Sequence, residues 1–328
     1  MRIAILGDGG WGTTLAVLLS NKGYSVTLWG AFADYTKRMV KTRYNPKFLP
    51  GIKIPRRIKI TSDIKSAAKD KEIVVLAIPS QYTRLTLRKI VGSFAKKTIF
   101  LSVTKGIEIS SSKRISEVIR AELGPVKLAV LSGPTIAGEV AKEVPTAAVV
   151  ASSSKQIRKT IQAVFSTKRF RVYTNPDVIG VELGGSLKNV IAIACGVSDG
   201  LGFGTNTKAA ILTRGLAEIS RLGKAMGAKL ETFSGISGLG DLVTTCISKQ
   251  SRNRSVGELI GKGKNLEEIC RHMQMVAEGV PTAKSAYALS LKYKIDMPII
   301  REVYYLLYKN KSPAQAVKDL MTRKSKEE

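Results

Sequence analysis

A glycine-rich turn near the start of the chain constrains its fold more than any other feature. The sequence GDGGWGTTLA, residues 7–16, directly follows the apolar run RIAILG and directly precedes a stretch of helical character. Gly7, Gly9 and Gly12 form the pattern G-x-G-x-x-G in the strand–turn–helix context that binds the pyrophosphate of a dinucleotide. The first glycine makes the turn, the second admits the pyrophosphate, and the third lets the helix pack against the sheet. A structural turn that binds no ligand is the alternative interpretation.

The first half of the chain alternates short apolar runs with helical stretches. Near-continuous apolar strands are typical of sheets covered on both faces, and their alternation with helices predicts a doubly wound parallel sheet of the Rossmann type. One helix should cover residues 13–23, with Gly23 as its C-cap. The runs that indicate strands are residues 2–7, 25–30, 72–79, 98–106, 126–134 and 146–152.

The pattern changes after about residue 175, where the periodicity becomes helical and no run indicates a strand. Asn175 and Pro176 mark the change. We therefore expect an N-terminal dinucleotide-binding domain over residues 1–176 and an all-α domain over residues 177–328, which would hold the substrate and the catalytic groups.

The chain has 53 lysines and arginines against 25 aspartates and glutamates, a formal net charge of +28. Such a charge favours anionic ligands and attracts nucleic acid. The basic residues are spread along the whole chain, however, and the sparse aromatic residues are not interleaved with them as a stacking platform requires. We expect no specific nucleic-acid partner.

Targeting and membrane segments are not expected. The first apolar run begins at residue 2, which leaves no room for a targeting peptide, and no apolar run approaches the length that spans a bilayer. The sequence therefore favours a cytoplasmic protein without membrane insertion.

The inventory of cysteines and histidines excludes several kinds of site. Cys195, Cys246 and Cys270 are far apart, and His272 is the single histidine. Neither a disulfide framework nor a metal site follows from these residues with normal spacing. His272 lies in the polar stretch CRHMQM, so we expect it at the surface and not as a catalytic base.

Lys188 lies where an apolar sequence can least tolerate a charge. Between residues 184 and 197 the polar side chains are Ser186, Lys188 and Asn189, and a helix apolar nearly all round should be buried. A buried lysine loses hydration, so its pKa should fall towards the range useful for proton transfer. The alternative is a lysine that extends from the start of the helix to water.

Asp241 is the sole carboxylate in the glycine-rich, apolar stretch TFSGISGLGDLVTTCIS. An unpaired buried carboxylate is costly, so Asp241 should have a cationic partner, for which Lys188 is the natural candidate. A purely structural cap at the start of a helix is the alternative.

Polar groups also follow two neighbouring predicted strands. Lys105 comes after the run TIFLSVT, and SGPT, residues 132–135, ends the next run. Ligands of doubly wound sheets bind outside the carboxyl ends of the strands, so these residues should face a ligand. A plain turn explains Gly133 and Pro134 equally well.

A basic segment precedes a later helical run. SRNRSVGELI presents Ser251, Arg252, Asn253 and Arg254 ahead of a helical run, and arginine and amide donors near a helix N-terminus suit a phosphate group. A solvated basic loop is the alternative.

One expected part of the dinucleotide site is missing. The second strand of such folds usually ends near an acidic residue that binds the adenosine ribose of NAD. Here residues 30–32 are Gly-Ala-Phe, Asp34 is displaced, and Lys37 and Arg38 lie further on. We expect a nicotinamide dinucleotide as the cofactor. Because the acid is missing, the choice between NAD and NADP stays open.

Taken together, seven segments resemble the bacterial NAD(P)-dependent glycerol-3-phosphate dehydrogenase family. The segment from residue 182 to residue 218 is the most specific of them. The resemblance implies a Rossmann domain and a helical domain, reversible hydride transfer between dihydroxyacetone phosphate and sn-glycerol 3-phosphate for glycerophospholipid synthesis, and a homodimer. The segments are GDGGWGTTLA, LSVTKGIE, LSGPTIAGEVA, the run that begins ELGGSLKNVIAIACGV, SGLGDLVTTC, SRNRSVG and VAEGVPTA.

The resemblance also implies roles for individual residues. Lys188 is similar to the catalytic proton donor and acceptor, Lys105 to the residue that polarises the carbonyl, and Asp241 to the carboxylate that orients the lysine. Positions that match substrate-binding residues are Lys105, Gly133, Thr135, Lys188, Asn189, Asp241, Ser251, Arg252 and Asn253. Positions that match cofactor-binding residues are Gly7, Gly9, Gly10, Trp11, Gly12, Lys105, Ala137, Arg252, Val276 and Glu278.

The chain departs from this family at two positions. Gly30 and Ala31 stand where members often carry an arginine, which leaves a preference for NADPH without support. Thr135 replaces a more usual serine and keeps the hydroxyl group. Two other functions stay open: a related β-hydroxyacid or 6-phosphogluconate type dehydrogenase, and a dinucleotide-sensing nucleic-acid binder without catalysis.

Overall fold

The computed structural model describes residues 1–273, 275–325 and 327, which form two compact units. The first unit comprises Met1–Lys105 and Lys113–Glu182, and the second comprises Gly106–Ser112 and the described part of Leu183–Glu328. The division falls inside helix α8, Val178–Gly200. The expected boundary between residues 176 and 177, which rests on the change of periodicity, stays a prediction.

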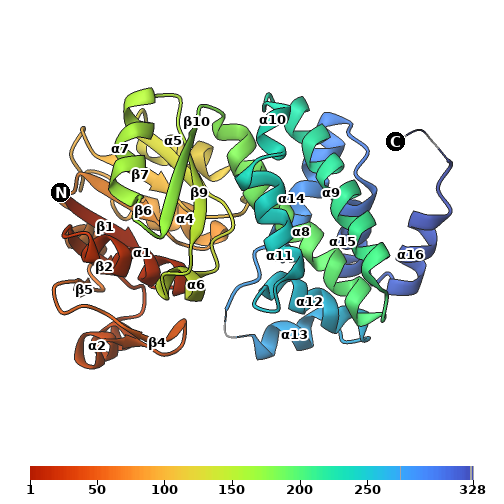
Figure 1. Ribbon diagram of the computed structural model, residues 1–328, viewed down its shortest axis with the longest axis horizontal. Helices are drawn as coiled ribbons and strands as arrows, with labels where there is room; N and C mark the ends of the chain where they lie inside the picture. Colours follow the sequence, from red (N-terminus) through yellow and green to blue (C-terminus); the bar gives the residue numbers. More distant parts are fainter. Residues whose placement is uncertain (274, 326, 328) are drawn as a thin grey trace. The chain divides into compact units, whose positions relative to one another are not determined.

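An eight-stranded sheet forms the centre of the first unit (Figure 1), in the order β10-β9-β8-β7-β6-β1-β2-β5. Neighbouring strands are parallel except β8 and β9, which are antiparallel, so β9 and β10 run against the other six. The strands are β1 Arg2–Leu6, β2 Ser25–Trp29, β5 Lys59–Thr61, β6 Ile73–Leu76, β7 Ile99–Ser102, β8 Lys127–Ser132, β9 Thr146–Ala151 and β10 Phe170–Asn175.

All six predicted strands are confirmed, as β1, β2, β6, β7, β8 and β9. No apolar run predicts β5 and β10, which lie at the two edges of the sheet, or the separate hairpin of β3 (Tyr44–Asn45) and β4 (Leu49–Lys53). In β10 buried and exposed residues alternate instead of forming a continuous apolar run, as expected for an edge strand that faces solvent on one side.

Side chains of β1 point alternately into two cores, one on each face of the sheet. Ile3 and Ile5 pack in one core with residues of α1, α2 and α7, whereas Ala4 and Leu6 pack in the other with residues of α3, α4 and α5. Helices on both faces confirm the doubly wound Rossmann arrangement. The helices are α1 Gly10–Asn21, α2 Ala33–Thr42, α3 Ile64–Ala68, α4 Ser80–Arg88, α5 Ile115–Leu123, α6 Ala137–Ala141 and α7 Lys155–Phe165.

The second unit contains helices and no strand among its described residues, as the periodicity predicts. Beyond α8, its elements are α9 Thr205–Ala225, α10 Leu230–Phe233, the π-helical turn η1 Ile236–Gly240, α11 Asp241–Ile247, α12 Arg252–Gly261, α13 Leu266–His272, α14 Gly279–Tyr293, α15 Pro298–Tyr308 and α16 Pro313–Met321.

Within the described chain, α8 is the one helix long and apolar enough to cross a membrane by length and composition. The expectation that no apolar segment approaches this length is therefore wrong. Of its most apolar window, however, 83% is buried inside the protein, as in the core helix of a globular domain.

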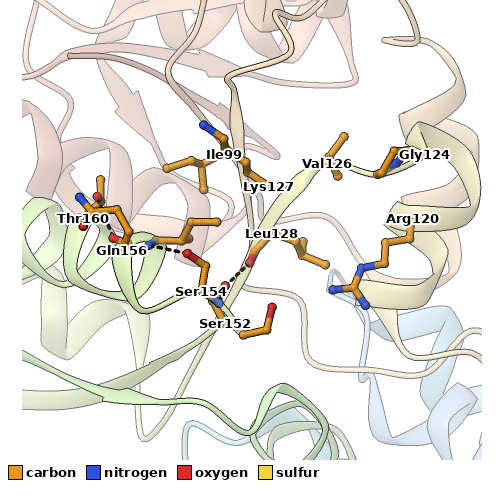
Figure 2. Close-up of a pocket in the computed structure, with 13 residues that line it drawn as sticks. Ile99, Arg120, Gly124, Val126, Lys127, Leu128, Ser152, Ser154, Gln156 and Thr160 are labelled. Atoms are coloured by element: carbon orange, nitrogen blue, oxygen red, sulfur yellow. Dashed lines mark hydrogen bonds between the residues drawn. The ribbon is translucent and has the colours of Figure 1, made fainter.

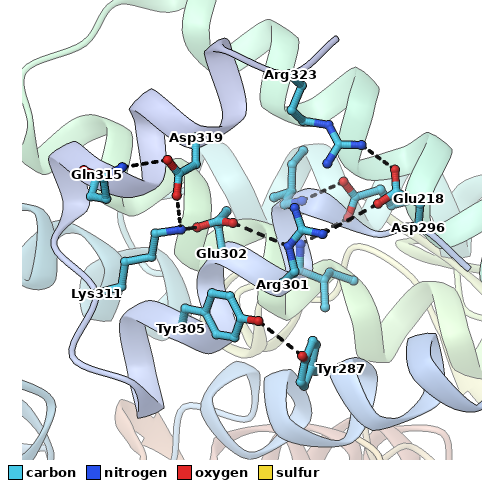
Figure 3. A network of polar contacts seen from close by, with 12 residues as sticks. Glu218, Tyr287, Asp296, Arg301, Glu302, Tyr305, Lys311, Gln315, Asp319 and Arg323 are labelled. Atoms are coloured by element: carbon cyan, nitrogen blue, oxygen red, sulfur yellow. Dashed lines mark hydrogen bonds and ion pairs between the residues drawn. The ribbon is translucent and has the colours of Figure 1, made fainter.

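A network of charged side chains links α15 and α16 (Figure 3). Lys311 forms ion pairs with Glu302 of α15 and Asp319 of α16, and Arg323 beyond α16 pairs with Asp296 at 2.5 Å. Nearby, Glu218 of α9 is buried against the first turn of α15. These contacts fix the C-terminal helices to the rest of the unit.

Candidate active site

The glycine-rich turn of the first unit joins β1 to α1. Gly7 has a φ of +120°, and a Cβ atom there would lie 2.3 Å from the carbonyl oxygen of Ala77. A Cβ atom at Gly12 would lie 1.9 Å from the carbonyl oxygen of Gly7. Gly9 differs, because no atom lies within 4 Å of where its Cβ would stand. The main chain is thus closely packed beneath the turn and open at Gly9, the N-cap of α1, as a dinucleotide pyrophosphate requires.

Other predicted cofactor residues lie beside this turn. A Cβ atom at Gly10 would contact the Cβ of Ala137 at 3.6 Å, and Thr14 Oγ1 donates a hydrogen bond to the carbonyl oxygen of Ala137. The indole Nε1 of Trp11 is buried and has no hydrogen-bond partner among the described residues. An orphaned buried donor next to an open main chain is consistent with a site for a polar ligand.

Asn45 supports the glycine-rich turn, a role that no sequence pattern predicts. Its Nδ2 donates to the carbonyl oxygen of Asp8 at 2.7 Å and to Thr13 Oγ1 at 2.8 Å, and the residue is completely buried. Asn45 lies in the β3–β4 hairpin, an element that apolar patterning does not reveal.

Lys105 and the SGPT segment meet at one edge of the sheet. Strands β7 and β8 are parallel neighbours, so the residues that follow them emerge side by side. Lys105 Nζ donates to the carbonyl oxygen of Gly133 at 2.7 Å and to Thr135 Oγ1 at 3.3 Å. The predicted position beyond the carboxyl ends of these strands is confirmed.

Lys188 of α8 and Asp241 of α11 form a buried ion pair. The distance from Lys188 Nζ to Asp241 Oδ1 is 2.5 Å, and the two residues are 5% and 1% exposed. Because Lys188 is buried and paired, it does not extend to water, and the predicted pairing is confirmed. Lys188 Nζ also donates to Thr245 Oγ1 at 2.6 Å. Thr245 was not predicted, although its position four residues after Asp241 on one helix could have indicated it.

Close contact of main chains sets this pair in place. A Cβ atom at Gly184, one turn before Lys188 in α8, would lie 2.6 Å from the carbonyl oxygen of Ser237 in η1. The π-helical turn η1 leads directly into α11, whose first residue is Asp241. Only glycine permits this approach of α8 to η1, and π-helical turns occur frequently at functional sites.

Residues 251–253 lie at the start of α12, as predicted. Ser251 is the N-cap, and its Oγ accepts a hydrogen bond from the main-chain N–H of Arg254 at 3.3 Å. Arg252 is exposed, and its Nη1 donates to the carbonyl oxygen of Val276 at 2.7 Å. The structure thus brings Arg252 into contact with Val276, and Glu278 lies two residues further along the same segment.

Asn253 links the start of α12 to α8. Its Nδ2 donates to Asn189 Oδ1 at 2.9 Å, and its Oδ1 accepts a hydrogen bond from the main-chain N–H of Gly279 at 2.8 Å. Asn189 directly follows Lys188, so this chain of hydrogen bonds connects the α12 N-terminus to the helix that carries the lysine.

Histidine, cysteine and metal chemistry gain no support from the described residues. His272 and Cys270 are exposed, whereas Cys195 and Cys246 are completely buried. The hydrogen bond with Cys195 and, after it, burial raise the pKa of the Cys246 thiol, which keeps it protonated. No group of three or more metal-ligating side chains is present in residues 1–273, 275–325 and 327.

A hollow of about 940 Å³ is present in the first unit (Figure 2). Its lining includes Arg120 of α5, Lys127 at the start of β8 and Gln156 of α7. The hollow is therefore at the edge of the sheet where β7 and β8 begin, opposite to the edge where ligands of doubly wound folds bind.

Comparisons with known proteins cover both units. The family described as NAD-dependent glycerol-3-phosphate dehydrogenase matches through its N-terminal part over residues 2–158 and its C-terminal part over residues 177–318. Proteins named glycerol-3-phosphate dehydrogenase (NAD(P)+) from Prosthecochloris aestuarii and Citrifermentans bemidjiense are 51% and 50% identical to this chain. Each alignment covers 100% of this chain, and the two alignments cover 100% and 98% of the respective relatives.

Solved structures give the same result. The crystal structure of glycerol-3-phosphate dehydrogenase from Coxiella burnetii is 40% identical, with a TM-score of 0.95 over 98% of this chain and 99% of that one. The yeast glycerol-3-phosphate dehydrogenase GPD1 is 29% identical, with a TM-score of 0.83 over 98% and 99% of the two chains.

Proposed function

The chain belongs to the NAD-dependent glycerol-3-phosphate dehydrogenase family, and we propose that Lys188 is its catalytic proton donor and acceptor. The enzyme is an NAD(P)-dependent oxidoreductase that transfers a hydride reversibly between NAD(P)H and dihydroxyacetone phosphate, giving sn-glycerol 3-phosphate. The observation that carries the role of Lys188 is its burial as an ammonium bonded to Asp241 and Thr245.

The residues of the first unit fit a dinucleotide. The open main chain at Gly9, the N–H groups at the start of α1 and the close packing at Gly7 and Gly12 suit its pyrophosphate. The bound dinucleotide supplies or accepts the hydride at the carbon that carries the substrate oxygen. Trp11 and Ala137 lie beside the same turn and line the proposed cofactor site.

Lys188 handles the charge and the proton on the substrate oxygen. Negative charge develops on that oxygen when the carbonyl is reduced, and the ammonium of Lys188 stabilises it and gives up a proton. In the reverse direction the neutral amine accepts that proton. The carboxylate of Asp241 and the hydroxyl of Thr245 hold Nζ in one place, so little reorganisation is needed during reaction.

Two further groups bind the substrate in this proposal. Arg252, with the N-terminus of α12 and Asn253, holds the phosphate, because a helix N-terminus and a guanidinium both favour an anion. Lys105, fixed by Gly133 and Thr135, polarises the carbonyl. Asn189 positions Asn253 through its side-chain amide.

The wider setting is also a proposal. The enzyme is a cytoplasmic homodimer that supplies glycerol phosphate for glycerophospholipids, without membrane insertion or a specific nucleic-acid partner. The burial of α8 supports the absence of insertion, and the even spread of basic residues along the sequence supports the absence of a nucleic-acid site.

Initial rates of NADH and NADPH oxidation with dihydroxyacetone phosphate test the proposal. Lys188→Ala should lower kcat by about 10²–10⁴-fold, the usual contribution of a positioned acid or base, while the dissociation constant of the dinucleotide stays nearly unchanged. Lys208→Ala is the matched control. Lys208 pairs with Asp199 at 2.7 Å in the same unit but is partly exposed, so its loss should leave kcat nearly unchanged.

Near-normal turnover by Lys188→Ala would remove the lysine from this role. The same assay with β-hydroxyacids and 6-phosphogluconate tests the related dehydrogenases, and faster turnover of either would replace the substrate named here. Filter binding of nucleic acid across salt concentrations tests the non-enzymatic alternative, which requires specific binding together with no oxidation.

A further inference from the structure

The end of β2 lacks the acid that usually binds the adenosine ribose in this fold. Strand β2 ends at Trp29 and is followed by Gly30. The first carboxylate after it, Asp34 in α2, has a fully exposed side chain that lies 3.7 Å from Lys37. Asp34 is therefore a surface residue with a partner of its own.

The structure places another carboxylate at the end of β2. A Cβ atom at Gly30 would lie 2.5 Å from Asp8 Oδ2 and 2.6 Å from Thr36 Oγ1. Asp8 belongs to the glycine-rich turn, 22 positions earlier in the sequence, and its side chain occupies the space that any side chain at residue 30 would need. The absence of a side chain at Gly30 is what admits it.

These polar atoms are buried and lack partners. Asp8 and Thr36 are 8% and 3% exposed, and neither Asp8 Oδ2 nor Thr36 Oγ1 has a hydrogen-bond partner in the part of the chain that the structure describes. An unsatisfied buried polar group costs free energy, more for a charged group, and such groups in native proteins call for a functional explanation.

The main chain of Asp8 is fixed, whereas its carboxylate is not neutralised. The carbonyl oxygen of Asp8 accepts hydrogen bonds from Asn45 Nδ2 at 2.7 Å and from Thr13 Oγ1 at 3.2 Å. Burial raises the pKa of the Asp8 carboxyl, and a hydrogen bond from its own main-chain N–H and the charge of Lys47 oppose the rise only in part. A group that donates a hydrogen bond to this carboxylate would relieve the cost of its burial.

We propose that Asp8 replaces the acid missing from β2, accepts a hydrogen bond from the adenosine 2′-hydroxyl of the bound dinucleotide, and thereby selects NADH over NADPH. A 2′-phosphate offers no hydroxyl donor at that position and brings a charge of about −1.5 to −2 towards a buried carboxylate. The inference rests on the proposed function only in that the chain binds a nicotinamide dinucleotide.

Binding without substrate tests this directly. Titration calorimetry with NADH, NADPH, 5′-AMP and adenosine 2′,5′-bisphosphate would be carried out on the wild type, Asp8→Asn and Asp34→Asn. Both variants remove one negative charge, but only Asp8 is buried at Gly30, so Asp34→Asn is the matched control. Thermal unfolding of each variant confirms that it is folded.

The wild type should bind NADH and 5′-AMP more tightly than their 2′-phosphorylated counterparts. Asp8→Asn should reduce the preference for NADH over NADPH at least about tenfold, because a hydrogen bond to a charged group is worth roughly that factor. Asp34→Asn should leave the preference unchanged. Tighter binding of NADPH by the wild type, or an unchanged preference in folded Asp8→Asn, would overturn the inference.

Gly30→Ala is the second variant for this binding test if Asp8→Asn does not fold. A methyl group there would lie 2.5 Å from Asp8 Oδ2 and must displace the carboxylate. The preference should fall in the same direction, and an unchanged preference would again overturn the inference. Since substrate is absent, the result is independent of the turnover that tests Lys188.

Discussion

Asp241 and Glu218 are carboxylates of the second unit with the same exposed fraction, 1%, but with different partners. Asp241 bonds to the ammonium of Lys188. Glu218 accepts hydrogen bonds from the main-chain N–H groups of Ile299 and Ile300 at 2.7 and 3.1 Å, at the start of α15 (Figure 3). One carboxylate holds the lysine that we propose as the proton donor, and the other holds two helices together.

The partners of Glu218 and Asp241 also differ in charge. Burial raises the pKa of Glu218 to about 7, because the two N–H groups and the more distant Arg221 offset the lost hydration only in part. Asp241 instead lies 2.5 Å from the ammonium nitrogen of Lys188, a partner of opposite charge. Burial alone therefore does not identify a catalytic acid, whereas the nature of the partner separates a chemical role from a structural one.

The largest difference should appear in turnover. Asp241→Asn should lower kcat by about 10²–10³-fold, because the neutral amide no longer holds or stabilises the Lys188 ammonium. Glu218→Gln should change kcat by less than about twofold, since a residue distant from the chemistry acts on stability. Steady-state rates with dihydroxyacetone phosphate measure both variants. Equal losses of kcat in two folded variants would contradict the distinction.

The next effect concerns stability and pH. Glu218 titrates near 7 when folded and near its ordinary value of 4.5 when unfolded, so the folded protein binds more protons between these values. The free energy of unfolding should therefore fall as pH rises from 4.5 to 7, with a contribution from Glu218 of up to about 3 kcal/mol. Below 4.5 and above 7 this contribution is constant.

Urea denaturation at pH 5 and pH 8 measures this slope, and Glu218→Gln should remove the contribution. Asp319→Asn is the control. The ion pair with Lys311 lowers the pKa of Asp319, so this group does not titrate in the same window. A slope that is identical in the wild type and Glu218→Gln would show that Glu218 is ionised throughout.

The smallest expected effect is a difference between Arg252 and Arg254. Arg252 is exposed and bonded to a carbonyl oxygen, whereas Arg254 pairs with Asp199 at 2.6 Å. Arg252→Ala should raise the KM for dihydroxyacetone phosphate about tenfold through the lost phosphate contact, with an unchanged Tm. Arg254→Ala should lower Tm and leave KM unchanged. If Arg252→Ala lowers Tm and leaves KM alone, its role is structural.

The sequence predicted those parts of the fold that burial controls. Strands covered on both faces were visible as apolar runs, whereas the edge strand β10, with exposed Arg171 and Tyr173, has the alternating pattern of a half-solvated strand. The reversal between β8 and β9 could not be predicted either. Strand direction depends on how the chain returns to the sheet, and the intervening residues form only the short helix α6.

The candidate site shows the same limit. Lys188 and Asp241 were visible because each is a charge in an apolar segment. Glu218 lies in the ordinary amphipathic sequence RGLAEISRLG, and Asp8 lies between glycines, so neither gives a sign of its burial. Their surroundings come from segments far apart in the chain, α15 for Glu218 and the end of β2 for Asp8, which only the folded structure brings together.

The contact of α8 with η1 at Gly184 limits how this enzyme can be redesigned. The close contact of the two main chains brings the helix that carries Lys188 beside the segment that leads into Asp241. A larger side chain at Gly184 should push these segments apart, and in the proposed mechanism it would disturb proton transfer to every ketone alike. In the proposed mechanism, the start of α12, where exposed Arg252 donates a hydrogen bond to the carbonyl oxygen of Val276, is where selection for a new substrate can act without changing the proposed proton transfer.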